Sequence, residues 1–97
     1  MHFEWDPPKD VENQRKHGVA FELAQRAFFD PNRVILKDVR HSTPTEERFF
    51  CLGKVDECIM TVRFVVRNRR IRIFGAGVWR EGKKRYAKTN SVPKSTT

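Results

Sequence analysis

Residues 48–74, RFFCLGKVDECIMTVRFVVRNRRIRIF, have the pattern of two adjacent β-hairpins. Two-residue turns at 56–57 and 68–69 would join three antiparallel strands. The turns impose a register, which pairs Phe49 with Phe64, Cys51 with Val62, Val55 with Cys58, Val66 with Ile71, and Phe64 with Ile73.

Side chains alternate between the two faces of a strand, so this register sorts the hairpins into two sets. One set is apolar and predicts a core: Phe49, Cys51, Met60, Val62, Phe64, Val66, Ile71 and Ile73. The other set predicts a solvent-exposed face, which we call the arginine face: Arg48, Phe50, Arg63, Val65, Arg67, Arg70, Arg72 and Phe74. Cations with aromatic rings between them suit a phosphate backbone and unstacked bases.

The residues before the hairpins predict a strand, two helices and a further strand. Aspartate followed by prolines is a good helix start, and glycine is a natural residue after a helix end. The second helix has apolar residues at helical spacing and stops because the residue before proline avoids the α region. In order, we expect a strand at Phe3-Glu4-Trp5, a polar helix from Asp6-Pro7-Pro8 to about His17, a helix with Phe21, Ala24, Ala27 and Phe28 that ends at Asp30-Pro31, a strand at Val34-Ile35-Leu36, and a polar loop from Asp38 to Thr45 that holds His41.

After the hairpins, Gly75-Ala76-Gly77 ends the last strand, and residues 81–88 predict a short basic helix. Residues 89–97 are small and polar, so we expect a disordered tail. The whole predicts one α+β domain over residues 1–88, with a mostly antiparallel sheet, two N-terminal helices on one face and a short C-terminal helix. The arginine face would be the uncovered face of this sheet.

Composition points to an anionic partner. The chain has 97 residues and a formal net charge of +8, from 20 lysines and arginines against 12 acidic residues. That charge favours nucleic acid, an acidic protein or an anionic membrane. No apolar run is long enough to span a membrane and the first residues do not resemble a signal peptide, so we expect a cytoplasmic protein without membrane association. In the predicted register Cys51 and Cys58 are not opposite each other, which favours two free thiols.

The sequence lacks the motifs of several enzyme classes. It has no Walker motif, no G-x-G-x-x-G, no H-E-x-x-H, no C-x-x-C and no serine in a G-x-S-x-G context. The three histidines stand far apart, so we expect no metal site. RNA cleavage needs less, because the 2′-OH is an internal nucleophile. Arg, Lys, Tyr and His can position the backbone, move protons and stabilise the charged phosphorane without metal.

The residues that could do this chemistry each have a structural alternative. His17 could equally cap a helix C-terminus, where the dipole favours a cation. His41 could be merely solvated in its loop, and Tyr86 could simply pack the last helix onto the sheet. Arg48 and Arg72 share a row across Val65 and are the strongest phosphate-binding candidates. The catalytic candidates are Arg72, Arg48, His17, His41, Arg80 and Tyr86, and the RNA-binding candidates are Arg63, Arg67, Arg70, Lys83, Lys84, Phe50 and Phe74.

The chain resembles the BrnT toxins, the ribonuclease partners of BrnA antitoxins in bacterial type II toxin–antitoxin operons. The resemblance covers about residues 3–88 and rests on the order and spacing of several short pieces. These are Phe3-Glu4-Trp5-Asp6, Lys9, Asn13, Lys16-His17-Gly18, Phe21, Ala24, Phe28, Asp30-Pro31, His41, Glu46-Glu47-Arg48-Phe49, Gly53, Ile71-Arg72-Ile73 and Arg85-Tyr86.

The resemblance implies a RelE-like fold, RNA cleavage without a cofactor, and neutralisation by a ribbon-helix-helix antitoxin. DNA would be contacted only indirectly, when the antitoxin carries the complex to the operon. The family commonly has Ser-Ala-Arg where this chain has Gly75, Ala76 and Gly77, so an arginine that could contact RNA is missing. The stretch after it, Trp79-Arg80 onward, also differs, and Ala20 stands where a capping serine is usual.

Three hypotheses follow. The first is a metal-independent endoribonuclease toxin. The second is a toxin relative whose activity has decayed at Gly77 and which acts as an RNA- or partner-binding module. The third, a DNA-binding regulator in its own right, has no recognition-helix motif to support it.

Overall fold

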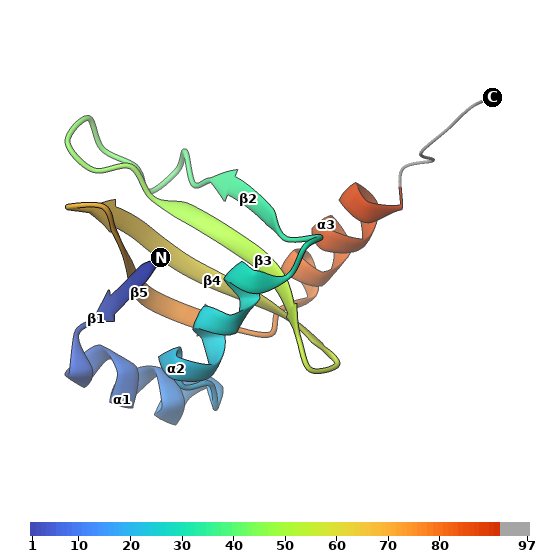
Figure 1. Ribbon diagram of the computed structural model, residues 1–97, viewed down its shortest axis with the longest axis horizontal. Helices are drawn as coiled ribbons and strands as arrows, with labels where there is room; N and C mark the ends of the chain where they lie inside the picture. The colour runs from blue at the N-terminus through green and yellow to red at the C-terminus, as the bar shows by residue number, and fades with distance from the viewer. Residues whose placement is uncertain (92–97) are drawn as a thin grey trace.

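The computed structural model of the protein describes residues 1–91 and has an α+β fold (Figure 1). Its elements are β1 (His2–Trp5), α1 (Pro7–His17), α2 (Phe21–Ala24), the 3₁₀ helix η1 (Gln25–Phe29), β2 (Val34–Lys37), β3 (Phe49–Val55), β4 (Cys58–Arg67), β5 (Arg70–Gly77) and α3 (Arg80–Asn90). The second predicted helix is therefore one α-helical turn that continues as a 3₁₀ helix. Among the described residues, the helices are too short and too polar to cross a membrane.

The five strands form one sheet in the order β1-β5-β4-β3-β2. β1 runs parallel to β5, and all other neighbours are antiparallel. The predicted hairpin register is confirmed, because Phe64 lies opposite Phe49 on one side and opposite Ile73 on the other. Past Ile73 the register shifts by one residue, so this β-bulge gives Phe74 and Gly75 together one partner, Arg63. The sequence analysis did not predict the bulge.

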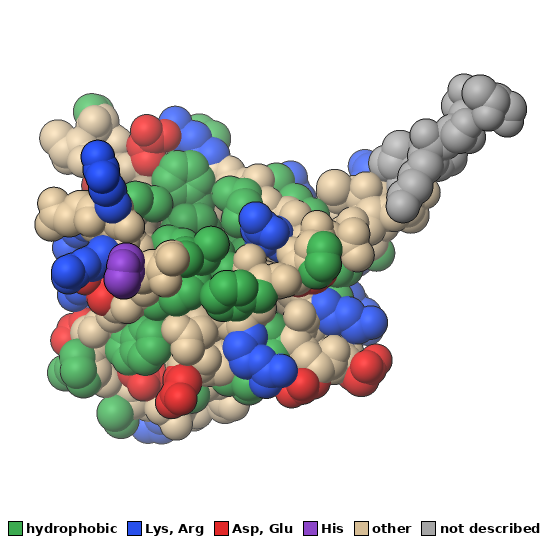
Figure 2. Space-filling view, in the orientation of Figure 1, with side chains coloured by type: hydrophobic (Ala, Val, Ile, Leu, Met, Phe, Trp, Pro, Cys, Tyr) green, Lys and Arg blue, Asp and Glu red, His purple; other side chains and the backbone are tan. Residues whose placement is uncertain are grey.

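The predicted core face carries the core, with one exception. Phe64, Val62 and Ile73 are buried there, and α2 and η1 cover them. η1 approaches β3 so closely that a Cβ on Gly53 would lie 2.2 Å from the carbonyl oxygen of Ala27, which leaves room for glycine alone. Hydrophobic side chains gather in the middle of this side of the molecule (Figure 2).

The exception is Val66, which was predicted in the core but is 55% exposed. It lies beside the β4–β5 turn, beyond the part of the sheet that the helices cover. The two cysteines are free, as expected, with Cys51 buried and Cys58 exposed. Burial raises the pKa of the Cys51 thiol to about 12, so this thiol stays protonated and unreactive at neutral pH.

α1 is held to the edge of β5 by a polar residue, Asn13, rather than by apolar packing. β1 pairs with β5 only as far as Ile73. Beyond that point the Asn13 side chain accepts a hydrogen bond from the Ala76 amide and donates to the carbonyls of Ala76 and Val19, at 2.8–3.2 Å. The buried amide group thus takes the place of a neighbouring strand. Val11, the clearest apolar residue of α1, is 66% exposed.

The ends of the N-terminal helices follow the sequence, with one replacement. Gly18 follows α1 in the left-handed conformation, and its amide bonds to the Gln14 carbonyl. Ala20 stands at the N-cap of α2 and offers no side-chain acceptor. The Phe21 amide instead donates to the carboxylate of Asp10 in α1 at 2.9 Å. A residue distant in sequence therefore supplies the missing cap.

The arginine face was predicted to be uncovered, and this prediction is wrong for half of the face and for Val65, which is 3% exposed. α3 packs on β3 and β4 through Gly82, where a Cβ would lie 2.1 Å from the Thr61 hydroxyl and 3.4 Å from Leu52. The helix runs to Asn90, two residues further than predicted, so the start of the expected disordered tail is helical. The rest of that expected tail, residues 92–97, lies outside the described residues.

Candidate functional site

The half of the arginine face that α3 leaves open carries a row of charged residues. Val65 of β4 pairs with Arg72 of β5, and Arg72 pairs with Glu4 of β1. Arg48 precedes β3 and continues this row on the other side of Val65. Strands lie about 4.8 Å apart, so the backbones of Arg48 and Arg72 are roughly 10 Å apart. Two arginine side chains can span that distance and bind one phosphate between them.

Two glutamates each form ion pairs with two arginines of this region. Glu4 contacts Arg72 at 3.2 Å and Arg70 at 3.5 Å. Glu46, in the loop before β3, contacts Arg67 at 2.5 Å and Arg48 at 3.6 Å. The hydrogen bond from Arg67 is the main reason why the pKa of Glu46 lies below its usual range. Both carboxylates compete with phosphate for the same guanidinium groups. The sequence analysis missed them, because they come from a distant strand and a loop.

Phe74 joins this row to a third arginine. The guanidinium carbons of Arg48 and Arg63 lie 5.0 and 5.1 Å from the centre of its ring, within cation–π range. The ring therefore holds two phosphate-binding candidates in place, whereas the sequence analysis had expected it to stack on RNA bases. The Arg63 Nε atom is buried and has no hydrogen-bond partner among the described residues.

A shallow groove of about 320 Å³ continues the cationic surface between α1 and the sheet. Its lining includes the candidate residues His17, Arg63 and Phe74, with the uncharged residues Asn13, Gly75 and Trp79 and the charged residues Lys9, Glu12 and Lys16. The rings of His17 and Trp79 meet edge to face at 5.1 Å. The lysines of α1 and Arg63 of β4 place cations on both walls of the groove.

Trp79 occupies the space that the glycine at position 77 leaves open. A Cβ on Gly77 would lie only 2.5 Å from the indole ring. The two differences from the usual family pattern, glycine at 77 and tryptophan at 79, are therefore coupled. A residue with a side chain at position 77 would displace the indole of Trp79.

His41 lies at the other end of the charged row, in the loop between β2 and β3. Its Nδ1 atom lies 2.9 Å from a carboxylate oxygen of Asp38. The Asp38 side chain is 6% exposed, and the imidazole is 53% exposed. The Asp38 amide donates to the Arg48 carbonyl at 2.7 Å, so the loop is anchored to the row. Asp38 did not figure among the sequence candidates.

Tyr86 is separate from this group. Its hydroxyl donates to Asp30 at 2.6 Å, and Asp30 also accepts from the Lys54 and Asn32 amides. Burial and the Asp30 carboxylate raise the pKa of Tyr86 to about 12. Lys54 is six residues along the chain from Arg48, which is about 20 Å of extended strand. The structure thus favours the packing interpretation of Tyr86.

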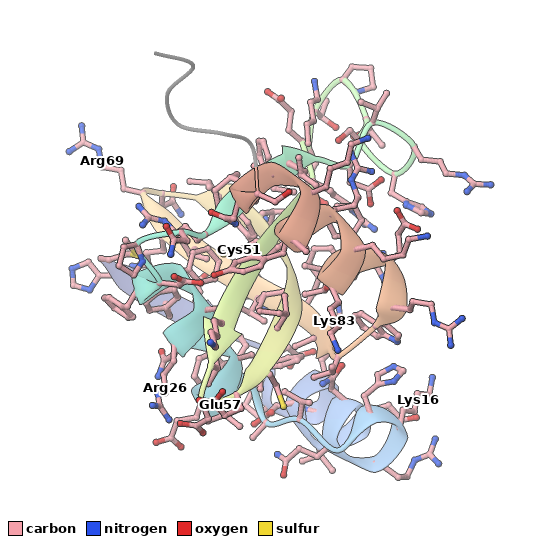
Figure 3. The ribbon with its side chains drawn as sticks, turned by 90° about the vertical axis from the view of Figure 1, so that its right-hand side faces the viewer. Lys16, Arg26, Cys51, Glu57, Arg69 and Lys83 are labelled. Atoms are coloured by element: carbon pink, nitrogen blue, oxygen red, sulfur yellow. The ribbon has the colours of Figure 1, made fainter. Side chains whose placement is uncertain are left out.

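The remaining candidates belong to α3 or to turns. Phe50 lines a small apolar cavity under α3 with Leu52 and Thr61, so it is not presented to solvent on the open half. Figure 3 shows Lys83 on α3 and Lys16 on α1. Arg69, at the β4–β5 turn, extends away from both of them. Arg80 and Lys84 are exposed on α3, and Arg67 and Arg70 are exposed beside the turn.

A family model described as "Ribonuclease toxin, BrnT, of type II toxin-antitoxin system" matches residues 5–82. No curated protein matches the chain. Within residues 1–91, no group of three or more His, Cys, Asp or Glu side chains is arranged to hold a metal ion.

Proposed function

The chain belongs to the BrnT family of ribonuclease toxins of type II toxin–antitoxin systems, and from this premise we propose that it is a metal-independent endoribonuclease. The open half of the arginine face would bind the RNA backbone. The site would need no cofactor.

One observation carries this proposal. Arg48 and Arg72 lie in one row on the open half of the sheet, and Phe74 ties Arg48 to Arg63. Cleavage through the 2′-OH passes through a phosphorane with extra negative charge. Guanidinium groups fixed around that phosphorus stabilise the charge without further reorganisation. Arg72 would hold the scissile phosphate, and Arg48 would share the developing charge. Arg80, at the start of α3, is a further candidate for sharing it.

The proposed reaction is an internal transesterification. The 2′ oxygen loses its proton and forms a bond to phosphorus, and the bond from phosphorus to the 5′ oxygen breaks. The 5′ oxygen takes a proton from water. The products are a 2′,3′-cyclic phosphate and a 5′-hydroxyl end.

The decisive experiment incubates purified protein with a defined RNA in EDTA and, separately, with Mg²⁺. Cleavage in EDTA with 2′,3′-cyclic phosphate ends would support the proposal. Cleavage that requires Mg²⁺ would refute metal independence. Absence of cleavage in both would refute the proposed activity.

A catalytically decayed relative is the second candidate. The ion pairs of Glu4 and Glu46 with the arginines, and the glycine at position 77, favour it. A decayed protein would bind RNA or a partner without cutting, and its induced expression would not arrest growth. Growth arrest that disappears with Arg72→Ala would exclude this candidate.

The partner in this proposal is a BrnA-like ribbon-helix-helix antitoxin, and any contact with DNA would be through that antitoxin. The family description supports an antitoxin, and the net charge of +8 favours an acidic or amphipathic segment of it. We also propose a RelE-like relationship of the fold and a cytoplasmic location. Both rest on the resemblance and on the sequence.

A further inference from the structure

We propose that Asp38 positions His41 as the group that removes the 2′-OH proton. This inference rests on the proposed ribonuclease function and deepens it. It selects one proton-transfer group from three candidates, and it adds a positioning residue that neither the sequence nor the family match identified.

The geometry of the pair is that of an oriented imidazole. The carboxylate of Asp38 lies 2.9 Å from Nδ1 of His41. An ionised aspartate is an acceptor only, so in the neutral imidazole Nδ1 carries the hydrogen and Nε2 is left with a free lone pair. The buried carboxylate and the half-exposed imidazole place the fixed end inside the protein and the reactive end in solvent. This is the role that the aspartate of a hydrolase triad has toward its histidine.

The loop that holds the pair is closed at its neck and tied to the phosphate-binding row. Main-chain and side-chain hydrogen bonds join residues 38 and 42 to Arg48. The Ser42 hydroxyl donates to the Asp38 carbonyl at 2.7 Å and accepts from the Arg48 amide at 2.9 Å. The imidazole position is therefore fixed relative to Arg48. A general base has to be fixed relative to the scissile phosphate in the same way.

The other candidates fit the task less well. The His17 ring meets the Trp79 ring edge to face, and within residues 1–91 it has no hydrogen bond to a carboxylate that would set its tautomer. The Tyr86 hydroxyl donates its hydrogen bond to Asp30. Asp30 lies beside Lys54, about 20 Å along β3 from Arg48 and the charged row. Glu46 lies near Arg48, but the hydrogen bond from Arg67 lowers its pKa and makes it a weaker base. Glu4, bound by Arg70 and Arg72, is the remaining competitor.

In the proposed step, Nε2 of neutral His41 takes the 2′-OH proton as the 2′ oxygen bonds to phosphorus. The 5′ oxygen departs and takes a proton from water. The imidazolium then returns its proton to the hydroxide that remains, so His41 ends neutral.

The first test reads the tautomer of His41 directly, by long-range ¹H–¹⁵N NMR of the full chain at a pH where the imidazole is neutral. The parent should carry its hydrogen on Nδ1. In Asp38→Asn the amide can donate to Nδ1, and the hydrogen should move to Nε2. A parent with the hydrogen on Nε2 would overturn the proposal whatever the activity.

The second test is kinetic. His41→Gln and Asp38→Asn should each lower kcat about 100-fold or more, the lower range for a general base, with KM changed by less than about threefold. The double variant should be no slower than His41→Gln, because Asp38 acts through His41. If the losses in kcat multiplied in the double variant, or if a lower melting temperature explained the loss in Asp38→Asn, Asp38 would have only a structural role.

His2→Gln is the control for loss of an exposed imidazole, because His2 lies in β1, at the opposite edge of the sheet from the loop that holds His41. Full activity of His41→Gln in a cleaving parent would overturn this inference and leave the ribonuclease function standing, and a large loss in Glu4→Gln would then make Glu4 the base. A parent that cleaves no RNA would refute the proposed function, and this inference with it.

Discussion

Replacing Arg72 with alanine is the most direct test of the arginine row. Arg72 lies centrally on the open half of the face, between Val65 and Glu4. The neighbouring isoleucines carry the packing of β5 on the core side, so the fold should remain. We expect RNA cleavage to fall about 100-fold or more, the effect of removing one preorganised group that stabilises transition-state charge. That corresponds to roughly 2.7 kcal/mol of transition-state stabilisation.

The expected effect on stability is much smaller. The Arg72 side chain is 33% exposed, and Glu4 keeps its contact with Arg70 after the change. The loss is that of one partly exposed ion pair, about 0.2–1 kcal/mol. A 100-fold loss of rate would thus not be explained by unfolding.

Arg67→Ala is a structurally matched control. Arg67 also shares a glutamate with a second arginine, since Glu46 keeps its contact with Arg48. Arg67 is 53% exposed and lies near the turn. Its removal should weaken RNA binding modestly and reduce the salt dependence of binding by about 0.7 in the log–log slope, as for one phosphate contact on a single strand.

The assay compares both purified variants with the parent on one labelled RNA, as single-turnover rates over a range of salt concentrations, with urea unfolding of each. Equal losses in the two variants would mean diffuse electrostatic binding instead of a site. Undiminished cleavage by Arg72→Ala would remove this residue from the mechanism.

Three further predictions concern other parts of the molecule. Tyr86→Phe should lower the free energy of unfolding by about 1–2 kcal/mol at pH 7, the worth of a hydrogen bond to a charged group. Burial alone would raise the pKa of Asp30, but hydrogen bonds from Tyr86 and two amides hold it below its usual range. This contribution is therefore present above the unfolded-state pKa of Asp30 and is lost as the pH falls through the folded-state pKa. The Tyr86 pKa of about 12 adds a loss of stability in the parent alone as the pH rises from about 10 toward 12. The difference in the free energy of unfolding between parent and variant, measured by urea unfolding at pH 3, 7 and 11, should therefore be smaller at pH 3 and pH 11 than at pH 7. A difference that does not change with pH would contradict the hydrogen bond between Tyr86 and Asp30. Gly77→Ala should cost about 1–3 kcal/mol and displace Trp79, because the new Cβ would meet the indole at 2.5 Å; the test is tryptophan emission and melting temperature in a Trp5→Phe background, and unchanged values would mean that the ring does not lie on this glycine. The antitoxin should cover the arginine face, so that the complex melts at a higher temperature than the free protein and antitoxin competes with RNA for binding; simultaneous binding of both would exclude direct occlusion of the site.

The hairpin register could be predicted because both turns are short and the apolar residues alternate without a break. A register shifted by one residue would have placed Phe64 on the solvent side of the sheet. In the structure Phe64 is buried, with 4% of its surface exposed. The bulge at Phe74 could not be predicted in this way. The apolar and polar residues of β5 fit an alternating pattern whether or not a residue is inserted there. Val66 follows the core pattern, yet the helices do not reach the end of the hairpin. Hydrophobic pattern alone does not report where the covering layer stops.

The positions of α1 and α3 escaped the sequence analysis for a related reason. The one buried residue of α1 is Asn13, and the one buried residue of α3 is Gly82. Neither residue contributes to hydrophobic periodicity, so both helices look like free surface helices. The candidate site was predictable as far as it lies on the three strands of the two hairpins. Glu4, Asp38 and Trp79 reach it from other elements, and only the tertiary fold brings them there.

Docking through a glycine has a consequence for local unfolding of α3. Gly82 lets the helix backbone approach the sheet, but it buries no apolar side chain of its own, and Tyr86 is only half-buried. The free energy that keeps α3 in place is therefore small compared with that of the central hairpins, where whole phenylalanine and isoleucine side chains leave water. Amide hydrogen exchange should reach the helix through sub-global opening, well before the strands beneath it exchange. Each such opening would uncover Phe50 and Leu52 and briefly enlarge the open part of the arginine face.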